Sequence, residues 1–294
     1  MSWLWMLAGA ALVLAAYLFL SAPSLRARKT PLARLYAHRG LHGCGATENG
    51  LEAFGRAVEA GVGIELDVRF TADKKLVVFH DDTLRRVCGR EERVDELTFA
   101  RLQTIPLPDG GRIPAFEEVL RLVDARVPLL VEIKTCPRVA ELSAAALAAL
   151  RGYAGQYAVE SFHPLALRYF RRHAPEVWRG QLVTIPEEYL QNTRASGAIA
   201  LSGLLANALS RPDFIAYDER MQGRLALRVQ TRLYRTRCAM WTVRDRRSLA
   251  AAIVRGHSAI FEAEASEAPI AVADAIALAA DKNPSAAGKA EAAP

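Results

Sequence analysis

Apolar and polar positions along this chain of 294 residues follow two alternating periods. Short apolar runs of strand character recur, such as GIELDVR at 63–69 and PLLVEIK at 128–134. Segments with helical spacing of their apolar positions, such as 51–59 and 139–151, separate these runs, and a further helix is predicted around 201–209. Strands that alternate with helices indicate a parallel sheet, because each helix returns the chain to the edge where the next strand begins.

One segment, LVVFH at 76–80, breaks this alternation. Only 70–75 separate it from the preceding strand, whereas a parallel crossover needs about a dozen residues or more, so the two strands must form an antiparallel hairpin. The turn of this hairpin falls at 73–75. Counting back from the turn places His80 roughly opposite Asp67.

Eight strands remain when the hairpin is set aside, and each is followed by a helix. Eight strand–helix units in about 250 residues predict a TIM (β/α)8 barrel, which we place at 34–280 with a small insertion at about 70–114, after the second strand. The tail at 281–294 has too little apolar content to fold and is predicted to be disordered. The eight strands end near these residues: His38, Asp67, Glu132, Phe162, Val183, Tyr217, Val243 and Glu262.

The N-terminal part of the chain contains an uncharged apolar run at 3–20. At about 1.5 Å per residue, a helix of this length spans roughly 27 Å, close to the bilayer core of about 30 Å. A cleaved signal peptide is the alternative, but no Lys or Arg precedes the run and the sequence before Pro23 is not an A-x-A-like cleavage site. We therefore expect residues 1–22 to form one transmembrane anchor.

Basic residues lie directly behind this apolar run, in a predicted linker at 23–33 and at the start of the barrel. Positive charge is retained on the cytoplasmic side of a membrane, so these residues predict a single-pass protein whose barrel lies in the cytoplasm. The four residues are Arg26, Arg28, Lys29 and Arg34.

The whole chain is mildly basic, with a net charge of +6, which suits solubility and attraction to anionic lipid headgroups. It contains no basic patch interleaved with aromatic residues and no nucleic-acid motif, which argues against nucleic acid as a partner. The cysteines lack metal-ligand spacing, which argues against a zinc site; their even count would allow two disulfides, but we expect free thiols. They are Cys44, Cys88, Cys136 and Cys238.

Acidic residues stand at the ends of two predicted strands. Glu65 and Asp67 are two positions apart and so face one side of their strand, and Glu132 and Lys134 repeat this spacing. The outward face of a barrel strand packs on helices and must be apolar, so these charged side chains point inward at the carboxyl ends, where TIM-barrel sites lie. Three converging carboxylates need a counter-charge, which is either a hard divalent cation or a salt-bridge network with Arg39 and Lys134.

Two histidines stand beside these carboxylates, since His38 ends the first strand and the hairpin carries His80. Two histidines next to such a site suit general acid–base catalysis near neutral pH. Further polar or aromatic residues at strand ends and in the adjacent loops are Glu48, Asn49, Asp81 and Trp241.

Eight short motifs occur in the order and at the spacing of one known family. They are YAHRG at 36–40, EN at 48–49, GIELDV at 63–68, VVFHDD at 77–82, IPAFEEVL at 113–120, VEIK at 131–134, ESF at 160–162 and MWTV at 240–243. From about residue 34 to 265, the chain therefore resembles the glycerophosphodiester phosphodiesterase family. The resemblance implies one divalent cation, Mg²⁺ or Ca²⁺, held by Glu65, Asp67 and Glu132, with His38 and His80 as the acid–base pair.

The same resemblance implies that Arg39 and Lys134 bind phosphate and that Trp241 packs against the alcohol moiety. Two departures from the family pattern concern the outer wall of the pocket. Gly50 stands where Thr or Ser usually follows Glu-Asn, and Glu262 stands near the usual Thr-Asp of the last strand. The candidate supporting residues are Glu48, Asn49, Asp81, Glu118, Ser161 and Phe162.

The activity expected from the resemblance is metal-dependent hydrolysis of glycerophosphodiesters to sn-glycerol 3-phosphate and an alcohol. A lysophospholipase D that acts on membrane lysophospholipids is the alternative, because the anchor would place the barrel close to lipid. The third interpretation is an inactive, membrane-tethered phosphate-binding protein, and the complete set of ligand residues argues against it.

Overall fold

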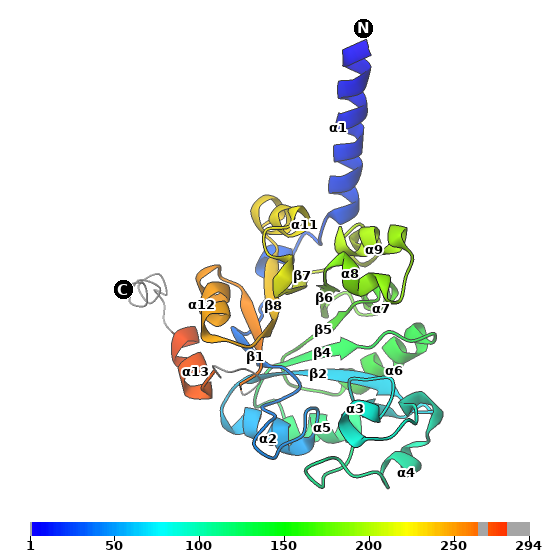
Figure 1. The fold of residues 1–294 in the computed structure, drawn as a ribbon, viewed down its shortest axis with the longest axis vertical. Helices are drawn as coiled ribbons and strands as arrows, with labels where there is room; N and C mark the ends of the chain where they lie inside the picture. Colours follow the sequence, from blue (N-terminus) through cyan, green and yellow to red (C-terminus); the bar gives the residue numbers. More distant parts are fainter. Residues whose placement is uncertain (1, 264–269, 281–294) are drawn as a thin grey trace.

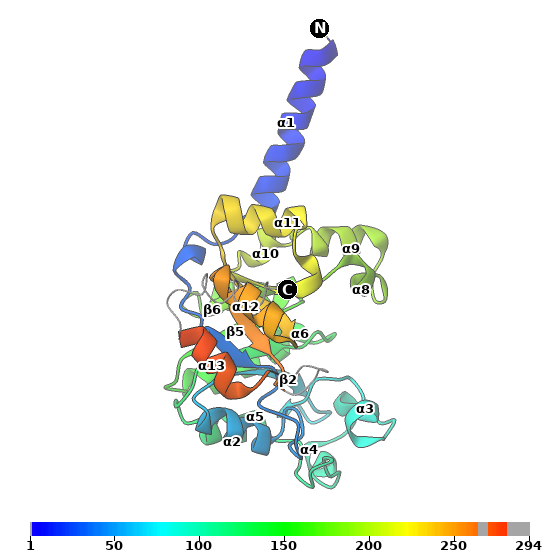
Figure 2. The ribbon, with the colours of Figure 1, turned by 60° about the vertical axis from the view of Figure 1, so that its left-hand side comes forward.

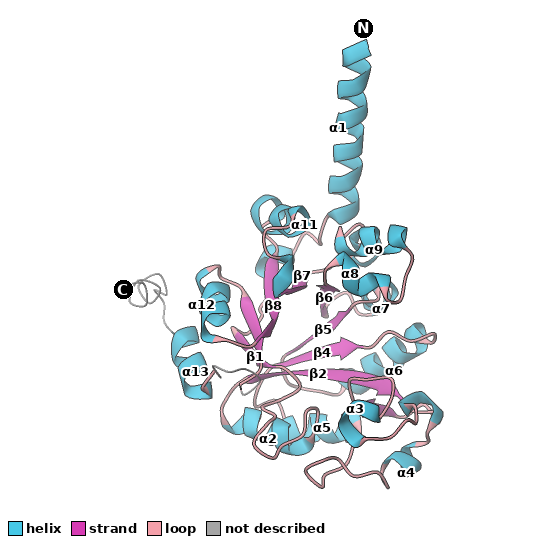
Figure 3. Cartoon of the chain, in the orientation of Figure 1, coloured by secondary structure: helices cyan, strands magenta, loops and turns pink. Residues whose placement is uncertain are grey.

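In the computed structural model, which describes residues 2–263 and 270–280, eight parallel strands close into a barrel surrounded by helices (Figure 1; Figure 3). Neighbouring strands follow the order β1-β9-β8-β7-β6-β5-β4-β2, and pairing of β1 with β2 closes the ring. The predicted TIM barrel is therefore confirmed. Its strands are β1 (Leu35–Ala37), β2 (Gly63–Phe70), β4 (Leu129–Ile133), β5 (Tyr157–Ser161), β6 (Trp178–Val183), β7 (Phe214–Asp218), β8 (Arg237–Val243) and β9 (Ser258–Phe261).

The predicted hairpin is also present, because β3 (Leu76–Val78) pairs antiparallel with the end of β2. Val68 lies opposite Val78, and the N–H of Phe79 donates to the carbonyl oxygen of Asp67 at 3.0 Å. The residue opposite Asp67 is thus Phe79, and His80 lies one position beyond it.

Helices cover the outside of the barrel. The helix predicted around 201–209 is in fact parts of two helices, because α9 ends at Ser202 and Leu204 adopts a φ of +60° before the next helix begins at Asn207. The helices behind the strands are α2 (Leu51–Glu59), α5 (Phe116–Val123), α6 (Val139–Arg151), α7 (Pro164–His173), α8 (Pro186–Leu190), α9 (Ala195–Ser202), α10 (Asn207–Ser210), α11 (Leu225–Arg228), α12 (Arg246–Val254) and α13 (Val272–Ala280). Short turns are η1 (Ala27–Lys29), η3 (Glu219–Met221) and the π-helical η4 (Val229–Tyr234), and the insertion holds α3 (Arg85–Cys88), η2 (Val94–Glu96) and α4 (Phe99–Leu102).

Three apolar clusters form the core. The largest lies between the strands and the surrounding helices, and a small one lies within the insertion. The third fills the barrel interior and includes Tyr36, Leu130 and Phe214. Gly180 is required there, because a Cβ at this position would lie 2.1 Å from the ring of Phe214. The interior of the barrel is therefore a packed base under the carboxyl ends of the strands.

Helix α1 (Ser2–Ser21) projects from the barrel, largely exposed along its length, and is long and apolar enough to cross a membrane (Figure 1). The segment behind it contacts the amino-terminal ends of the strands. Arg26 pairs with Asp213 at 2.9 Å, and the hydroxyl of Thr30 donates to the carbonyl oxygen of Asp213 at 2.7 Å. The tail predicted to be disordered lies outside the described residues.

Candidate active site

The carboxyl ends of the strands surround a cavity of about 550 Å³. Its position follows from the parallel barrel, because every strand ends at the same rim. Residues from seven strands or the loops after them line it, together with the hairpin. They include His38, Arg39, Glu65, His80, Asp81, Glu132, Glu160, Phe162, Trp241 and Glu262.

Three buried carboxylates converge at the base of this cavity. Glu65, Asp67 and Glu132 offer oxygen atoms that all lie within 4.8 Å of one another. Asp67 and Glu132 are neighbours across paired strands, and Glu132 is in turn the neighbour of Glu160 on β5. A fourth buried carboxylate therefore lies at the same level of the barrel.

The cations at this level do not balance the carboxylates. Lys134 Nζ lies 2.9 Å from Glu132 Oε1 and 3.2 Å from Asp67 Oδ1, and Arg39 Nε lies 3.4 Å from Asp67 Oδ2. Four carboxylates thus share two cations in the described structure, so ionisation of all four would leave two negative charges uncompensated. Glu160 Oε2 is buried and has no hydrogen-bond partner among the described residues. This donor set fits one divalent cation, which prefers oxygen ligands.

The pKa values respond to the crowding. Burial, with Asp67 and Glu160 nearby, raises the pKa of Glu65 well above its ordinary value, and burial beside Glu132 does the same for Glu160. Burial would also raise the pKa of Asp67, but the positive charges of Lys134 and Arg39 hold that pKa well below its ordinary value. The cluster therefore holds at least one carboxylate firmly ionised and disfavours ionisation of its neighbours.

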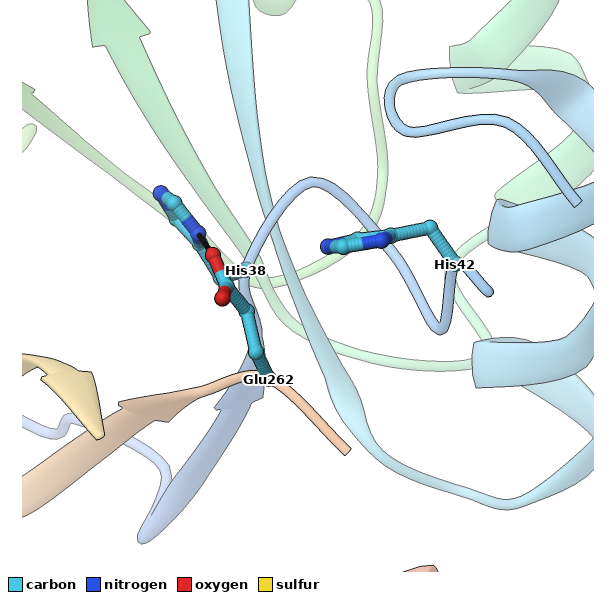
Figure 4. Close-up of side chains that lie close together, drawn as sticks. All are labelled: His38, His42 and Glu262. Carbon is cyan, nitrogen blue, oxygen red and sulfur yellow. Dashed lines mark hydrogen bonds and ion pairs between the residues drawn. The ribbon is translucent and has the colours of Figure 1, made fainter. Parts of the chain in front are cut away.

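His38 lies at the rim between β1 and β9. Its Nδ1 lies 2.6 Å from Glu262 Oε1, and its Nε2 lies 3.9 Å from Glu65 Oε2 (Figure 4). Burial lowers the pKa of His38 to about 4, against the hydrogen bond with Glu262, which raises it. Figure 4 also shows His42, from the following loop, directed at this pair, and its Nε2 has no hydrogen-bond partner in the described part of the chain.

His80 reaches the same cavity from the hairpin. Its Nδ1 lies 2.6 Å from Asp81 Oδ1, and Arg86 holds the other oxygen of Asp81 at 2.7 Å. Each of the two histidines therefore bonds a carboxylate through Nδ1, which leaves Nε2 for contact with a ligand.

The turn after β1 presents Arg39. Arg39 has a φ of +55° and Gly40 one of +83°, where a Cβ on Gly40 would lie 2.9 Å from the backbone of Ala53. This turn directs the N–H of Arg39 to Glu65 Oε2 at 3.0 Å, and the Arg39 guanidinium pairs with Glu48 at 2.8 Å. Gly40 is therefore required in the His-Arg-Gly sequence, because the backbone of Ala53 leaves no room for a side chain.

Asn49 and Glu48 bind charged residues of the carboxylate cluster and its surroundings. Asn49 Nδ2 donates to Asp67 Oδ2 at 2.8 Å. Burial raises the pKa of Glu48, but Arg86 and Arg39 outweigh it and lower that pKa to about 2. Both residues therefore orient charged groups of the site.

Aromatic side chains form one wall of the cavity. Trp241 and Phe162 pack edge to face with ring centroids 5.6 Å apart. Trp241 Nε1 is buried and unpartnered in the described structure.

Two of the candidate supporting residues lie elsewhere. Glu118 accepts a hydrogen bond from the N–H of Ala115 at 2.8 Å and so caps α5, and Ser161 donates to the carbonyl oxygen of Ile133 at 2.6 Å. Neither residue lines the cavity. Their contacts are structural, and their supporting role stays a prediction.

Sequence reasoning missed two residues with clear roles in the geometry. Glu160 shows the same inward alternation as Glu65 and Asp67, so the pattern of β5 could have identified it. Arg244 pairs with Glu262 at 2.8 Å across β8 and β9, and no local pattern indicates that contact.

The model of the glycerophosphoryl diester phosphodiesterase family matches residues 38–263. The chain belongs to this family. Similar proteins include the glycerophosphodiester phosphodiesterase of Bacillus altitudinis, 34% identical over 35% of this chain and 45% of that protein. Lysophospholipase D GDPD1 of Homo sapiens is 33% identical over 40% of this chain and 38% of its own length. Each of these alignments covers less than half of the relative.

Solved structures extend the similarity over the barrel. A phosphodiesterase from Oleispira antarctica, in complex with the product sn-glycerol-3-phosphate, superimposes with a TM-score of 0.68. The match covers 85% of this chain and 99% of that one at 21% identity, a level that shows a shared fold.

Proposed function

We propose that this chain hydrolyses glycerophosphodiesters to sn-glycerol 3-phosphate and an alcohol in a metal-dependent reaction. The observation that carries the proposal is the convergence of Glu65, Asp67 and Glu132 with His38 and His80 at one cavity. The names of the Bacillus relative and of the Oleispira phosphodiesterase with its bound product support this substrate class.

Glu65, Asp67 and Glu132 would hold one divalent cation, Mg²⁺ or Ca²⁺. The charge deficit of the cluster and the unpartnered Glu160 oxygen support this assignment. When bound, the cation would neutralise negative charge on the phosphoryl oxygens of the substrate.

The side chains of Arg39 and Lys134 would bind the phosphodiester, since both present positive charge beside the carboxylates. One of His38 and His80 accepts a proton from the attacking oxygen, which belongs to water or to a neighbouring substrate hydroxyl. The other histidine donates a proton to the leaving alkoxide oxygen. Trp241 would pack against the alcohol moiety.

A lysophospholipase D reaction is the second candidate, and the similarity to human lysophospholipase D GDPD1 favours it. The bond that breaks is the same in both reactions. The candidates differ in whether the glycerol moiety of the substrate carries an acyl chain.

Helix α1 would anchor the protein as a single transmembrane span. Its apolar, exposed side chains and the basic residues that follow it support this role, with the barrel, at about 34–280, proposed to lie on the cytoplasmic side. The boundaries of the anchor, linker and insertion remain predictions.

A side-by-side assay tests these proposals. Full-length protein in detergent should release sn-glycerol 3-phosphate from glycerophosphocholine and glycerophosphoglycerol faster than it cleaves lysophosphatidylcholine. Preference for lysophosphatidylcholine would support the second candidate, and absence of turnover on all three would contradict the phosphodiesterase proposal.

A further inference from the structure

The barrel holds the carboxyl-terminal end of α1 firmly. The last four carbonyl groups of a helix lack partners within it. Here, side chains from the barrel supply donors: Tyr234 to Leu18 at 2.7 Å, Arg211 to Phe19 at 2.8 Å, and both Asn207 and Gln230 to Ser21 at 2.9 and 2.8 Å. These contacts fix how the barrel lies relative to α1.

The contact between Tyr234 and Leu18 sets the level of one surface. Tyr234 ends η4, so α11 and η4 lie beside the last turn of α1, as Figure 1 and Figure 2 both show. If 3–20 occupy the hydrocarbon core, Leu18 lies near its edge. The α11–η4 surface, defined as residues 222–237, then lies at the level of the lipid headgroups.

The composition of the α11–η4 surface suits that position. Leu225 and Leu233 are 67% and 53% exposed, so their apolar side chains face solvent in the described structure. The segment contains no Asp or Glu. Its five arginines are all exposed: Arg224, Arg228, Arg232, Arg235 and Arg237.

A hollow of about 550 Å³ adjoins this surface. Arg228 and Arg232 line it together with Arg255 and His257. None of these three arginines lies within ion-pair distance of an acidic side chain among residues 2–263 and 270–280. Unpaired arginines around a hollow favour an anionic ligand with phosphate-like oxygens.

We propose that the α11–η4 surface lies on an anionic phospholipid bilayer, with headgroup phosphates held by Arg228, Arg232 and Arg255. Leu225 and Leu233 enter the interface beside them, as in membrane-surface helices that combine arginine with exposed leucine. The inference rests on the proposed anchoring role of α1 and is independent of the catalytic proposal.

Arginine footprinting on the full-length protein tests the proposal. Nanodiscs are prepared from phosphatidylcholine alone or mixed with phosphatidylglycerol, and phenylglyoxal modification of each arginine is followed by mass spectrometry. Modification of Arg228 and Arg232 should be about fivefold slower in the anionic discs, the factor that corresponds to about 1 kcal/mol per arginine at such a surface. Arg121 and Arg151 are exposed and belong to α5 and α6, which lie away from α11 in Figure 1, and they are the internal controls.

A double variant tests whether the arginines act together. Arg228→Gln/Arg232→Gln should remove the lipid-dependent protection of Arg224 and Arg235, whereas Arg121→Gln/Arg151→Gln should retain it. Equal rates in both discs, or equal slowing at Arg121 and Arg151, would overturn the proposal. Protection by inorganic phosphate in phosphatidylcholine discs to the same extent would show a free-phosphate site instead. Loss of the protein from discs in high salt would contradict the anchor, and the docking surface with it.

Discussion

Substitution of Glu262 by Gln tests how the first histidine is positioned. Glu262 bonds His38 Nδ1 at 2.6 Å and Arg244 at 2.8 Å, and its own pKa of about 2 keeps it ionised at neutral pH. The carboxylate fixes the proton of His38 on Nδ1 and leaves Nε2 facing Glu65. In Glu262→Gln the volume is kept and the charge is lost.

The size of the effect follows from this one bond. A hydrogen bond to a charged group contributes about 1.5–3 kcal/mol, and each 1.4 kcal/mol or so corresponds to tenfold in rate. We therefore expect kcat to fall about 10- to 100-fold with little change in KM, because Glu262 does not bind the phosphate. The pKa of His38 should fall further below its ordinary value, since the carboxylate that favours its protonated form is gone.

The assay is steady-state hydrolysis of glycerophosphocholine, together with NMR titration of the His38 imidazole. Glu262→Asp should restore part of kcat, and Glu141→Gln, an exposed carboxylate on α6, should leave it unchanged. An unchanged kcat and an unchanged His38 pKa in Glu262→Gln would refute the positioning role.

Three further predictions follow from the site, the barrel and the anchor. His38→Ala and His80→Ala should each lose about 10²-fold or more in kcat, and the double variant should lose much less than the product, which steady-state kinetics would show. Gly180→Ala should lower the free energy of unfolding by about 1–3 kcal/mol because its Cβ meets the ring of Phe214, whereas Gly55→Ala in α2, where nothing lies within 4 Å, should not; denaturant unfolding measures both. A C-terminal fluorescent protein should be bright and a C-terminal alkaline phosphatase inactive, and the opposite pattern would place the barrel outside the cytoplasm.

Local sequence patterns were enough to predict the barrel and the three carboxylates. Glu65 and Asp67 were found because a two-residue period assigns side chains to one face, and the hairpin was found because its loop is too short for a crossover. The bond between His38 and Glu262 joins positions 224 residues apart and depends on closure of β1 against β9. A local sequence pattern cannot predict a contact between positions so far apart in the sequence.

Motif membership alone was a weaker guide. Glu118 and Ser161 belong to the family-like motifs, yet their hydrogen bonds go to the start of α5 and the end of β4, and neither lines the cavity. Glu160, which lies beside the candidate metal ligand Glu132, was overlooked, although its side chain faces the barrel interior by the same alternation as that of Glu65. The position of a side chain in the fold therefore says more about its contacts with the cavity than its membership of a motif does.

Metal dependence of hydrolysis tests the central proposal most directly. Full-length protein treated with EDTA and then dialysed is assayed on glycerophosphocholine while Mg²⁺ or Ca²⁺ is added back, alongside Glu65→Ala and Glu132→Ala. We expect the metal-free protein to be inactive, one of the two cations to restore activity, and both variants to stay inactive at every metal concentration. Full activity of the metal-free protein, or wild-type activity in either variant, would contradict a metal centre built on these carboxylates.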